Sequence, residues 1–323
     1  MVKPHRIGII GLGHVGAHVA YSLLMQGIPG ELYLCDVIDQ KVASETQDFL
    51  DSLSFCPYNC KIVNVGSNYE ALAECDIIVN AAGKVELAAV TRDGELHFTT
   101  DACRTFAGRI AAAGFDGIWV TIANPCDVVA TEIWHLTGCD PRHVIGSGTA
   151  LDSSRFRHEL SMATGWDPKS IQGYMIGEHG VSQLAAWSQV AFGGKPLAQL
   201  EVEQPERFLL DKAGIEDRAR RGGYITLAGK GCTEYAVASS AARICAAVLH
   251  DEHTILACST LMNGAYGEHG VYASVPCVIG ANGVEQIIEL DLSAEERAGF
   301  HNSCEAIRAN IGRLEWWDEK AAE

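Results

Sequence analysis

The stretch Gly11-Leu12-Gly13-His14-Val15-Gly16 joins a predicted strand to a predicted helix and thereby decides the fold class. Residues 6–10 form a short β-branched run, and residues 15–27 carry apolar side chains at helical spacing. Further strand-like and helical segments alternate as far as residue 145. This alternation predicts an α/β fold with a doubly wound parallel sheet, in which helices cover both faces.

The predicted elements divide the chain into two parts. In the first part we expect strands at 32–36, 61–65, 75–81, 118–122 and 144–145, and helices at 41–53, 95–114 and 128–137. After residue 147 the alternation is irregular, with helices at 151–164, 205–220 and 232–249 and strands near 171–177, 186–194, 254–262 and 271–280. A capping-box pattern of Ser293 and Glu296 opens a final helix. The sequence thus predicts one domain over 1–147 and an α+β domain over 148–323.

The glycine stretch also indicates a dinucleotide. Its residues Gly11, Gly13 and Gly16 permit a tight turn and a close approach of the backbone to a pyrophosphate, which the helix N-terminus stabilises. Asp36 ends the next predicted strand, 20 residues after Gly16, where a carboxylate accepts hydrogen bonds from ribose hydroxyls and repels a 2′-phosphate. NAD is therefore favoured over NADP, and residues 1–147 are expected to form a Rossmann domain. The alternative to a dinucleotide site is that the glycine stretch is an ordinary strand–helix turn.

The composition is that of an acidic globular protein. Of the 323 residues, 48% are hydrophobic, which is enough for a sizeable core, and the formal net charge is −17. Sequence-independent nucleic-acid binding requires clusters of Lys and Arg, so we expect no nucleic-acid partner. We find neither an apolar run that could span a membrane nor a signal peptide, so we expect a cytoplasmic protein.

Metal-binding patterns are weak in this sequence. The 12 cysteines are scattered through apolar segments without a Cys-x-x-Cys pair, which indicates buried free thiols in a reducing compartment. His14 and His18 are four residues apart on a predicted helix, but they do not form a His-Glu-x-x-His motif. We therefore expect no metal site.

A candidate catalytic histidine lies in the stretch Gly177-Glu178-His179-Gly180. Neutral imidazole is the natural proton carrier near pH 7, and a nearby carboxylate fixes its tautomer. Asp152 is the candidate for that carboxylate. Arg155 follows Asp152 by three residues, so the two share a helix face, and its guanidinium can bind a substrate carboxylate as a bidentate fork. A plain ion pair between Asp152 and Arg155 is the alternative.

Two further polar residues follow predicted strands. Arg92 lies after the fourth strand, where we expect a closing loop, and an arginine there can polarise a substrate carbonyl and exclude water. Asn124 precedes Pro125 after the fifth strand, at the carboxyl edge of the sheet, where open α/β sheets bind ligands. The alternative for Arg92 is an ordinary surface charge, and the alternative for Asn124 is a common Asn-Pro turn.

Along nearly its whole length the chain resembles the L-lactate/malate dehydrogenase superfamily. The matching blocks are GLGHVG at 11–16, AG at 82–83, TR at 91–92, GFDGI at 114–118, ANPCDV at 123–128, VIGSGTALDSSRFR at 144–157, GEHG at 177–180, KGCTEYA at 230–236 and SVPCVIG at 274–280. The stretches GYMIGEHGVSQLAAWS at 173–188 and ELHFTT at 95–100 are most similar to L-2-hydroxyisocaproate dehydrogenases.

The resemblance implies an NAD-dependent enzyme that interconverts a 2-oxo acid and an L-2-hydroxy acid. It implies that His179 moves the proton with Asp152 as its partner, while Arg155 holds the substrate carboxylate and Arg92 polarises the carbonyl. Substrate contacts are also implied at Asn124 and Thr233. Cofactor contacts are expected at Gly11, Gly13, Val15, Gly16, Asp36, Lys41, Tyr69, Gly83, Ile122, Asn124 and Ser147. A homo-oligomer is expected, either a dimer or a homotetramer.

The segment before Arg92 departs from the family pattern. Where lactate enzymes carry a glutamine and malate enzymes an arginine, this chain has Glu86, whose charge disfavours malate. Glu86 could instead face solvent, pair with Lys84 or bind a cationic substrate. Alanines at 88, 89, 185 and 186 predict a roomier apolar pocket for a branched or aromatic 2-oxo acid.

Two other functions compete with this prediction. One is an L-lactate dehydrogenase that acts on pyruvate, and the other is a non-catalytic NAD-binding protein on the same fold. Gln172 stands where the family's sugar-phosphate-activated members carry an effector histidine, so activation by fructose 1,6-bisphosphate is not expected.

Overall fold

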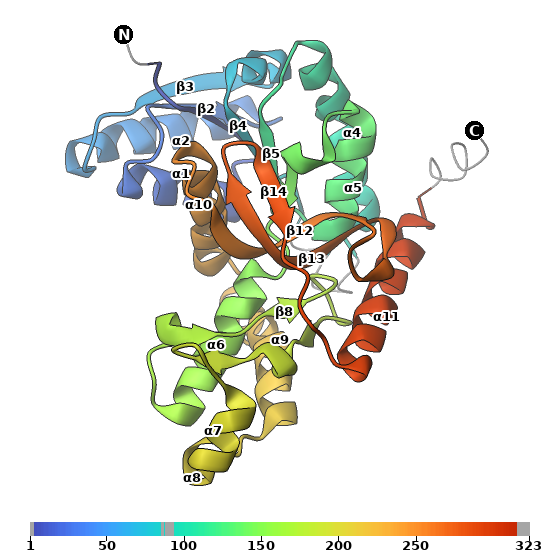
Figure 1. Cartoon of the computed structure of the whole chain (residues 1–323). Helices are drawn as coiled ribbons and strands as arrows, with labels where there is room; N and C mark the ends of the chain where they lie inside the picture. Colours follow the sequence, from blue (N-terminus) through green and yellow to red (C-terminus); the bar gives the residue numbers. More distant parts are fainter. Residues whose placement is uncertain (1–2, 85–86, 88–93, 315–323) are drawn as a thin grey trace.

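The computed structural model describes residues 3–84, 87 and 94–314 and is organised around one nine-stranded sheet (Figure 1). The strand order is β14-β13-β12-β6-β5-β4-β1-β2-β3. Six of these strands come from the first part of the chain, namely β1 Arg6–Ile10, β2 Glu31–Cys35, β3 Lys61–Gly66, β4 Ile77–Asn80, β5 Ile118–Thr121 and β6 Val144–Gly146. Neighbours within this group run parallel. The predicted doubly wound parallel sheet is confirmed.

Continuous apolar runs explain why these strands lie inside the molecule. The strands β4, β5 and β6 are buried along their whole length. Ile77 and Val79 belong to one hydrophobic cluster, whereas Ile78 between them belongs to another. Because side chains alternate across a strand, each face of the sheet has its own core and needs its own layer of helices.

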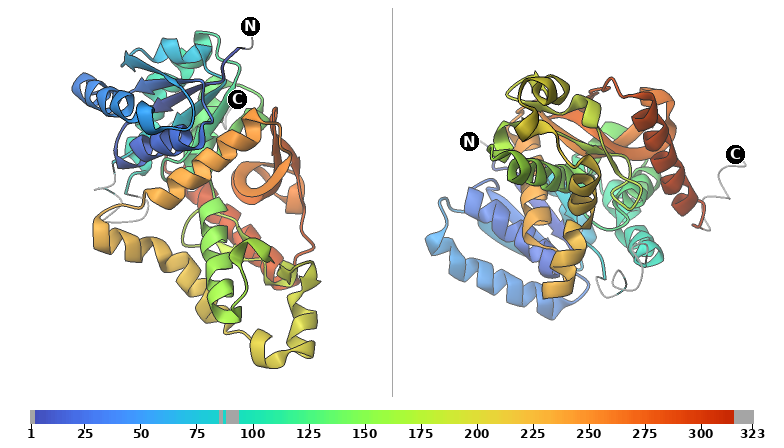
Figure 2. Two further views of the ribbon diagram at one scale, coloured as in Figure 1. Left: turned by 90° about the vertical axis from the view of Figure 1, so that its left-hand side faces the viewer. Right: turned by 90° about the horizontal axis from the view of Figure 1, so that it is seen from below.

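Helices from distant parts of the sequence supply these layers. They are α1 His14–Gln26, α2 Asp39–Ser52, α4 Leu96–Ala112, α5 Cys126–Thr137 and α10 Tyr235–Leu249. The helix α1 packs against α10, and α4 packs against α5; Figure 2 shows α10 beside α1. The contact between α1 and α10 brings the glycine stretch close to the second part of the chain. No helix of the described residues is both long and apolar enough to cross a membrane.

Strands of the second part extend the same sheet across the predicted boundary at residue 147. β12 Thr254–Asn263, β13 His269–Gly280 and β14 Gly283–Ile287 pair antiparallel, and β12 joins β6 through Ser259 and Gly146. A Cβ on Gly146 would lie 2.7 Å from the Cβ of Ser259, so this close approach requires glycine. The division into two domains at residue 147 stays a prediction.

The rest of the second part packs outside the large sheet. It contains one small sheet of β7 Ile171–Gln172, β10 Ala191–Phe192 and β11 Lys195–Pro196, and another of β8 Met175–Ile176 and β9 Leu184–Ala185. Its helices are α6 Ala150–Thr164, α7 Leu197–Glu203, α8 Pro205–Phe208, α9 Lys212–Lys230 and α11 Ala294–Ile311. The helix α6 packs along α9, so the segment that carries Asp152 and Arg155 lies against a long helix.

The predicted helix over 205–220 is wrong. The helix α8 ends at Phe208, and α9 begins at Lys212 and continues to Lys230. Asp211 separates the two because its side chain accepts a 3.0 Å hydrogen bond from the Gly214 N–H and so caps a new helix. The helix α7 and the strand β14 were not predicted, whereas the capping box of Ser293 and Glu296 at the start of α11 is confirmed.

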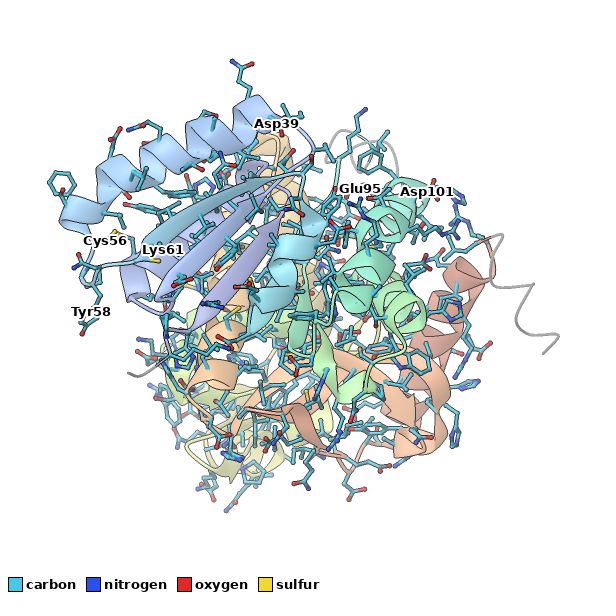
Figure 3. All side chains as sticks on the ribbon, turned by 90° about the horizontal axis from the view of Figure 1, so that it is seen from above. Asp39, Cys56, Tyr58, Lys61, Glu95 and Asp101 are labelled. Carbon is cyan, nitrogen blue, oxygen red and sulfur yellow. The ribbon has the colours of Figure 1, made fainter. Side chains whose placement is uncertain are left out.

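The carboxyl ends of the parallel strands meet at one edge of the sheet. Asp39 begins the helix after β2, Glu95 precedes α4, and Figure 3 shows both toward this edge. Lys61 begins β3 and lies with Cys56 and Tyr58 toward the opposite end. The loops at the carboxyl edge are therefore the ones available to build a ligand site.

A buried carboxyl group on α5 is incompletely hydrogen-bonded. Glu132 is fully buried, and its Oε1 accepts a 3.1 Å bond from Arg104 Nε, whereas its Oε2 finds no hydrogen-bond donor among the described residues. Burial raises the pKa of Glu132 from 4.5 to about 7, against the opposing effect of Arg104. The native protein then binds this proton more tightly than the unfolded chain. The contribution of Glu132 to the stability of the folded protein therefore falls as the pH rises from about 4.5 to about 7.

The variant Glu132→Gln tests this linkage, since an amide cannot lose a proton. Relative to the unmodified protein, it is expected to gain about 1–2 kcal/mol of stability between pH 5 and pH 8. Thermal unfolding of both proteins at several pH values measures the difference. Glu70→Gln, which removes an exposed partner of Arg109, serves as the control and should show no such gain. A difference in Tm that does not change with pH would contradict the assignment.

Candidate active site

The predicted histidine and aspartate meet at the carboxyl edge of the sheet. His179 lies in the loop after β8, and its Nδ1 is 2.6 Å from Oδ2 of Asp152 in the first turn of α6. Asp152 is fully buried, while the His179 side chain keeps 18% of its surface exposed. Because Nδ1 is bound to the carboxylate, the Nε2 atom is the ring nitrogen left for a substrate. This is the arrangement that a general acid–base histidine requires.

The backbone of the His179 loop is held by three separate elements. Gly177 exchanges two 2.9 Å hydrogen bonds with Ser274 of β13, and the Glu178 N–H donates to Ser303 Oγ of α11 at 2.7 Å. Gly177 has a φ of +93°, and a Cβ there would lie 2.4 Å from Ser303 Oγ. Glycine at this position therefore satisfies both the backbone conformation and the close approach of α11. The third element is α5.

Asp127 on α5 is a site residue that sequence reasoning missed. Its Oδ2 accepts the backbone N–H of His179 at 2.7 Å, and its Oδ1 accepts the Ser259 hydroxyl of β12 at 2.5 Å. The residue is only 2% exposed, and burial raises the pKa of its carboxyl above the usual range. The available signal was its place in the block ANPCDV, three residues after Asn124.

Arg155 combines both roles considered for it. Its Nη1 donates to Asp152 Oδ1 at 2.9 Å, so the plain ion pair is present, and the side chain also lines a cavity beside His179. The guanidinium lies against Gly222 and Gly223 of α9, where added Cβ atoms would come within 3.1 and 3.4 Å of the Arg155 side chain. Two adjacent glycines weaken a helix by about 1 kcal/mol each. Here Gly222 makes room for Arg155, because a Cβ at 3.1 Å would be closer than an ordinary contact.

A cavity of about 350 Å³ joins the glycine stretch to the catalytic pair. It is bounded by the N-terminus of α1, the loops after β4, β5 and β6, the His179 loop and helices α9 and α10. The predicted residues that line it are Gly13, Val15, Gly83, Ile122, Asn124, Ser147, Arg155, His179 and Thr233. Sequence reasoning did not assign Gly223, Tyr224, Leu227 or Val237, which also line it.

The glycine stretch fits a dinucleotide pyrophosphate. A Cβ on Gly16 would lie 1.8 Å from the carbonyl oxygen of Gly11, which itself has a φ of +87°. An added Cβ on Gly13 meets nothing within 4 Å, so the backbone is open there at the start of α1. Asp36 accepts the Leu12 N–H through Oδ2 at 2.7 Å and the Ile38 N–H through Oδ1 at 3.0 Å. Its carboxylate thus holds the turn beside the expected ribose position.

Several predicted site residues lie elsewhere or outside the described part of the chain. Lys41 pairs with Glu45 at 2.5 Å, and Tyr69 is buried against Phe106, both away from the cavity lining. Their assignment as cofactor contacts stays a prediction. Arg92 and Glu86 lie outside the described residues, as do the alanines at 88 and 89.

The prediction that Ala185 and Ala186 widen the substrate pocket is wrong. Neither residue lines the cavity. Ala185 is 2% exposed and packs in the cluster around Phe156, and Ala186 is fully buried among residues of α11 and β13. Their small side chains accommodate the packing of neighbouring elements.

Comparison with known proteins agrees with this geometry. Residues 5–146 match the NAD-binding domain of lactate/malate dehydrogenases, and residues 149–315 match the α/β C-terminal domain of the same family. The chain is 37% identical to an L-lactate dehydrogenase of Fusobacterium nucleatum over 96% of this chain and 97% of that protein. It is 38% identical to L-lactate dehydrogenase 1 of Bifidobacterium longum over 97% and 99% of the two chains.

Solved structures show the same relationship. A lactate dehydrogenase from a Medee basin deep-sea metagenome library, MGS-M5, superposes with a TM-score of 0.90 at 32% identity, covering 96% of this chain and 99% of that one. A minor L-lactate dehydrogenase from Enterococcus mundtii superposes with a TM-score of 0.87 at 32% identity, covering 96% of this chain and 98% of that one. The chain therefore belongs to the lactate/malate dehydrogenase family. It is an NAD-dependent oxidoreductase that acts on a CH–OH group.

The contact between Asp127 and His179 can be tested by removing the carboxylate. Asp127→Ala is expected to lower kcat about 10- to 100-fold, because a displaced catalytic group loses its alignment, while the Kd for NADH changes little. Asp127→Asn should recover most of the activity. The amide oxygen can still accept the His179 N–H, and the Ser259 hydroxyl can accept a hydrogen bond instead of donating one. Full turnover in Asp127→Ala would contradict the positioning role.

Proposed function

We propose that this chain is an NAD-dependent L-2-hydroxy acid dehydrogenase whose preferred substrate is a 2-oxo acid with a bulky apolar side chain. The observation that carries the reaction class is the pair of His179 and Asp152, placed with Arg155 at the cavity that begins at the glycine stretch. A non-catalytic NAD-binding protein would not need this combination of side chains.

The proton is moved by His179. When bound, NADH supplies a hydride for carbon 2 of the 2-oxo acid. The His179 imidazolium gives its Nε2 proton to the oxygen on that carbon, so the products are the 2-hydroxy acid, NAD⁺ and a neutral imidazole. Asp152 accepts the Nδ1–H throughout at 2.6 Å, which fixes the ring orientation and directs Nε2 to the substrate.

Arg155 is proposed to hold the substrate carboxylate. One edge of its guanidinium is fixed by Asp152 Oδ1, and an arginine can present its remaining donors as a planar fork. The family resemblance adds Arg92 as the group that polarises the carbonyl, with Asn124 and Thr233 as substrate contacts. Asn124 and Thr233 line the same cavity as Arg155.

The apolar wall of the cavity supports the larger substrate. Leu151, Leu227 and Val237 line it, and Gly223, whose Cβ would lie 3.4 Å from Arg155, contributes no side chain. A substrate whose carboxylate is held by Arg155 would therefore share the cavity with these apolar side chains. The position of the missing side chain at Gly223 would also be open to it. A branched or aromatic group could occupy that space.

Pyruvate is the second candidate substrate, and the relatives favour it. Those at 36–38% identity carry the name L-lactate dehydrogenase and match the chain over almost its full length. A panel of pyruvate, 2-oxoisocaproate, phenylpyruvate and oxaloacetate, followed by the loss of NADH absorbance, distinguishes the two. A higher kcat/KM for the bulky acids supports our proposal, and a higher value for pyruvate overturns it.

The role of His179 is tested by His179→Asn. Loss of general acid–base catalysis is expected to lower kcat at least about 100-fold, while NADH still binds. His301→Asn is a matched control, because His301 also pairs with a carboxylate, Glu268, at 2.7 Å but does not line the cavity. Equal activity of the His179→Asn variant and the control would refute the mechanism.

The variant Gly223→Ala tests the shape of the pocket. The new methyl group would touch Arg155 Nη2 at 3.4 Å, an ordinary contact, and would occupy part of the cavity. We expect kcat/KM for 2-oxoisocaproate to fall about tenfold relative to that for pyruvate. Gly229→Ala lies on the same helix, where a Cβ meets nothing within 4 Å, and should leave the ratio unchanged. If Gly223→Ala leaves the ratio of the two kcat/KM values unchanged, Gly223 does not determine the substrate preference.

A further inference from the structure

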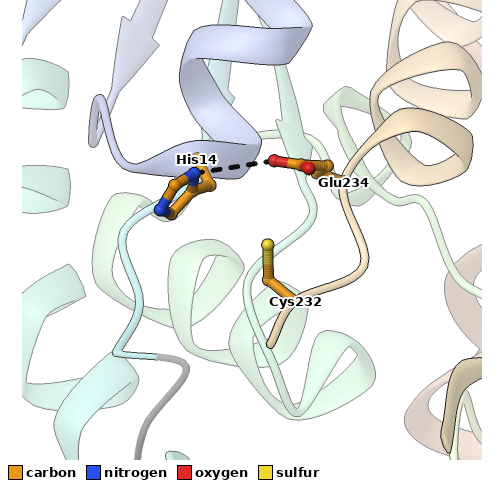
Figure 4. A group of neighbouring side chains, drawn as sticks. All are labelled: His14, Cys232 and Glu234. Atoms are coloured by element: carbon orange, nitrogen blue, oxygen red, sulfur yellow. Dashed lines mark ion pairs between the residues drawn. The ribbon is translucent and has the colours of Figure 1, made fainter. Parts of the chain in front are cut away.

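Three potential metal ligands meet beside the cavity. His14 is the first residue of α1, and Cys232 and Glu234 lie in the short connection between α9 and α10. Figure 4 shows the Cys232 sulfur directed toward the gap between His14 and Glu234. One ligand atom from each residue lies within 4.8 Å of the other two. This group was not predicted from the sequence because His14 is more than 200 residues from Cys232 and Glu234 in the chain.

The spacing is close to that of a tetrahedral site. His14 Nδ1 lies 3.6 Å from Glu234 Oε2. Two ligands on a zinc ion with bonds of about 2.0–2.2 Å are separated by about 3.4 Å. Imidazole, thiolate and carboxylate are all established zinc ligands, and three protein ligands leave the fourth position open. His14 and Glu234 therefore have the separation of two ligands on one ion, and the Cys232 sulfur lies within 4.8 Å of both.

The carboxylate of Glu234 offers a buried oxygen ligand beside His14 and Cys232. Glu234 is 7% exposed and makes no capping bond to α10, and its Oε2 finds no hydrogen-bond donor among the described residues. His18 Nδ1 lies 3.1 Å from this oxygen and 2.7 Å from the His14 carbonyl oxygen. Lys230 pairs with the other oxygen, Oε1. A metal ion at Oε2 would satisfy an atom that is otherwise costly to bury.

We propose that His14, Cys232 and Glu234 bind a thiophilic divalent cation, with zinc as the representative ion, in competition with the dinucleotide. His14 and Cys232 both line the cavity that also contains Gly13, Val15 and Thr233. An ion held there would tie the N-terminus of α1 to the start of α10 across the entrance. The competition rests on the cofactor role of this cavity, whereas the metal site itself rests on the three side chains alone.

A second group of potential ligands provides a comparison within the same chain. Asp251, His253 and Glu285 also bring their ligand atoms within 4.8 Å of one another, but Asp251 and His253 are exposed and no thiol is present. Glu285 already pairs with His253 Nε2 at 3.0 Å. An exposed set of oxygen and nitrogen atoms without sulfur holds zinc less tightly than a set that includes a buried thiolate. This group therefore serves as the control.

Zinc titration of the metal-free full-length protein, followed by calorimetry, tests the site. Variants His14→Asn and Cys232→Ser are each expected to weaken zinc binding at least about tenfold, since even outer-sphere changes cost that much. Controls His253→Asn and Cys56→Ser should bind zinc as the unmodified protein does. Because the His14 side chain is 76% exposed, its replacement does not disturb packing, and thermal unfolding in the presence of EDTA verifies that each variant is folded.

Competition is measured by NADH fluorescence titration with and without zinc. Zinc is expected to raise the apparent Kd for NADH in the unmodified protein and in both controls, but much less in His14→Asn and Cys232→Ser. Equal zinc affinity in all variants, or an NADH titration that zinc does not change, would overturn the proposal. Substrate preference is measured separately in EDTA, so a failure here is distinguishable from a failure of the proposed dehydrogenase function.

Discussion

The site depends first on the buried carboxylate of Asp152. Its two oxygens receive the two groups that the reaction needs, His179 Nδ1 at 2.6 Å and Arg155 Nη1 at 2.9 Å. A fully buried carboxylate would be costly if it were not paired, and here both partners compensate it. Because both partners also face the cavity, the interaction that stabilises Asp152 sets the distance between proton donor and carboxylate clamp. Structural and catalytic requirements therefore coincide in one residue.

The large sheet provides the frame for this carboxylate. Asp127 at the start of α5 connects the His179 backbone to Ser259 of β12, and β12 meets β6 at Gly146. The α6 helix, which carries Asp152, begins shortly after β6. Elements from both parts of the chain thus meet at one junction of the sheet. A change of packing there would move the histidine relative to its aspartate.

Local patterns made much of this architecture predictable from the sequence. The strand–glycine–helix pattern, the alternation of apolar runs and the Ser293–Glu296 capping box depend on neighbouring residues, and the structure agrees with them. The roles of Asp127 and Gly223 could not be predicted in the same way, because each depends on a partner far along the chain, His179 or Arg155. The break at Asp211 was missed because apolar residues on both sides continue a helical spacing.

An acidic chain can still bind anionic ligands if its nearby carboxylates are occupied. Glu95 and Glu178 line the cavity, but Glu95 Oε1 accepts the Lys84 N–H at 2.6 Å and Glu178 Oε2 accepts the Ser182 hydroxyl at 2.6 Å. One oxygen of each carboxylate is thereby hydrogen-bonded to a donor of the protein. Arg155 and the N–H groups at the start of α1 are then the donors that an anionic ligand can meet inside the cavity. The net charge of −17 counts every ionisable side chain of the protein, whereas ligand binding depends on which atoms face the cavity.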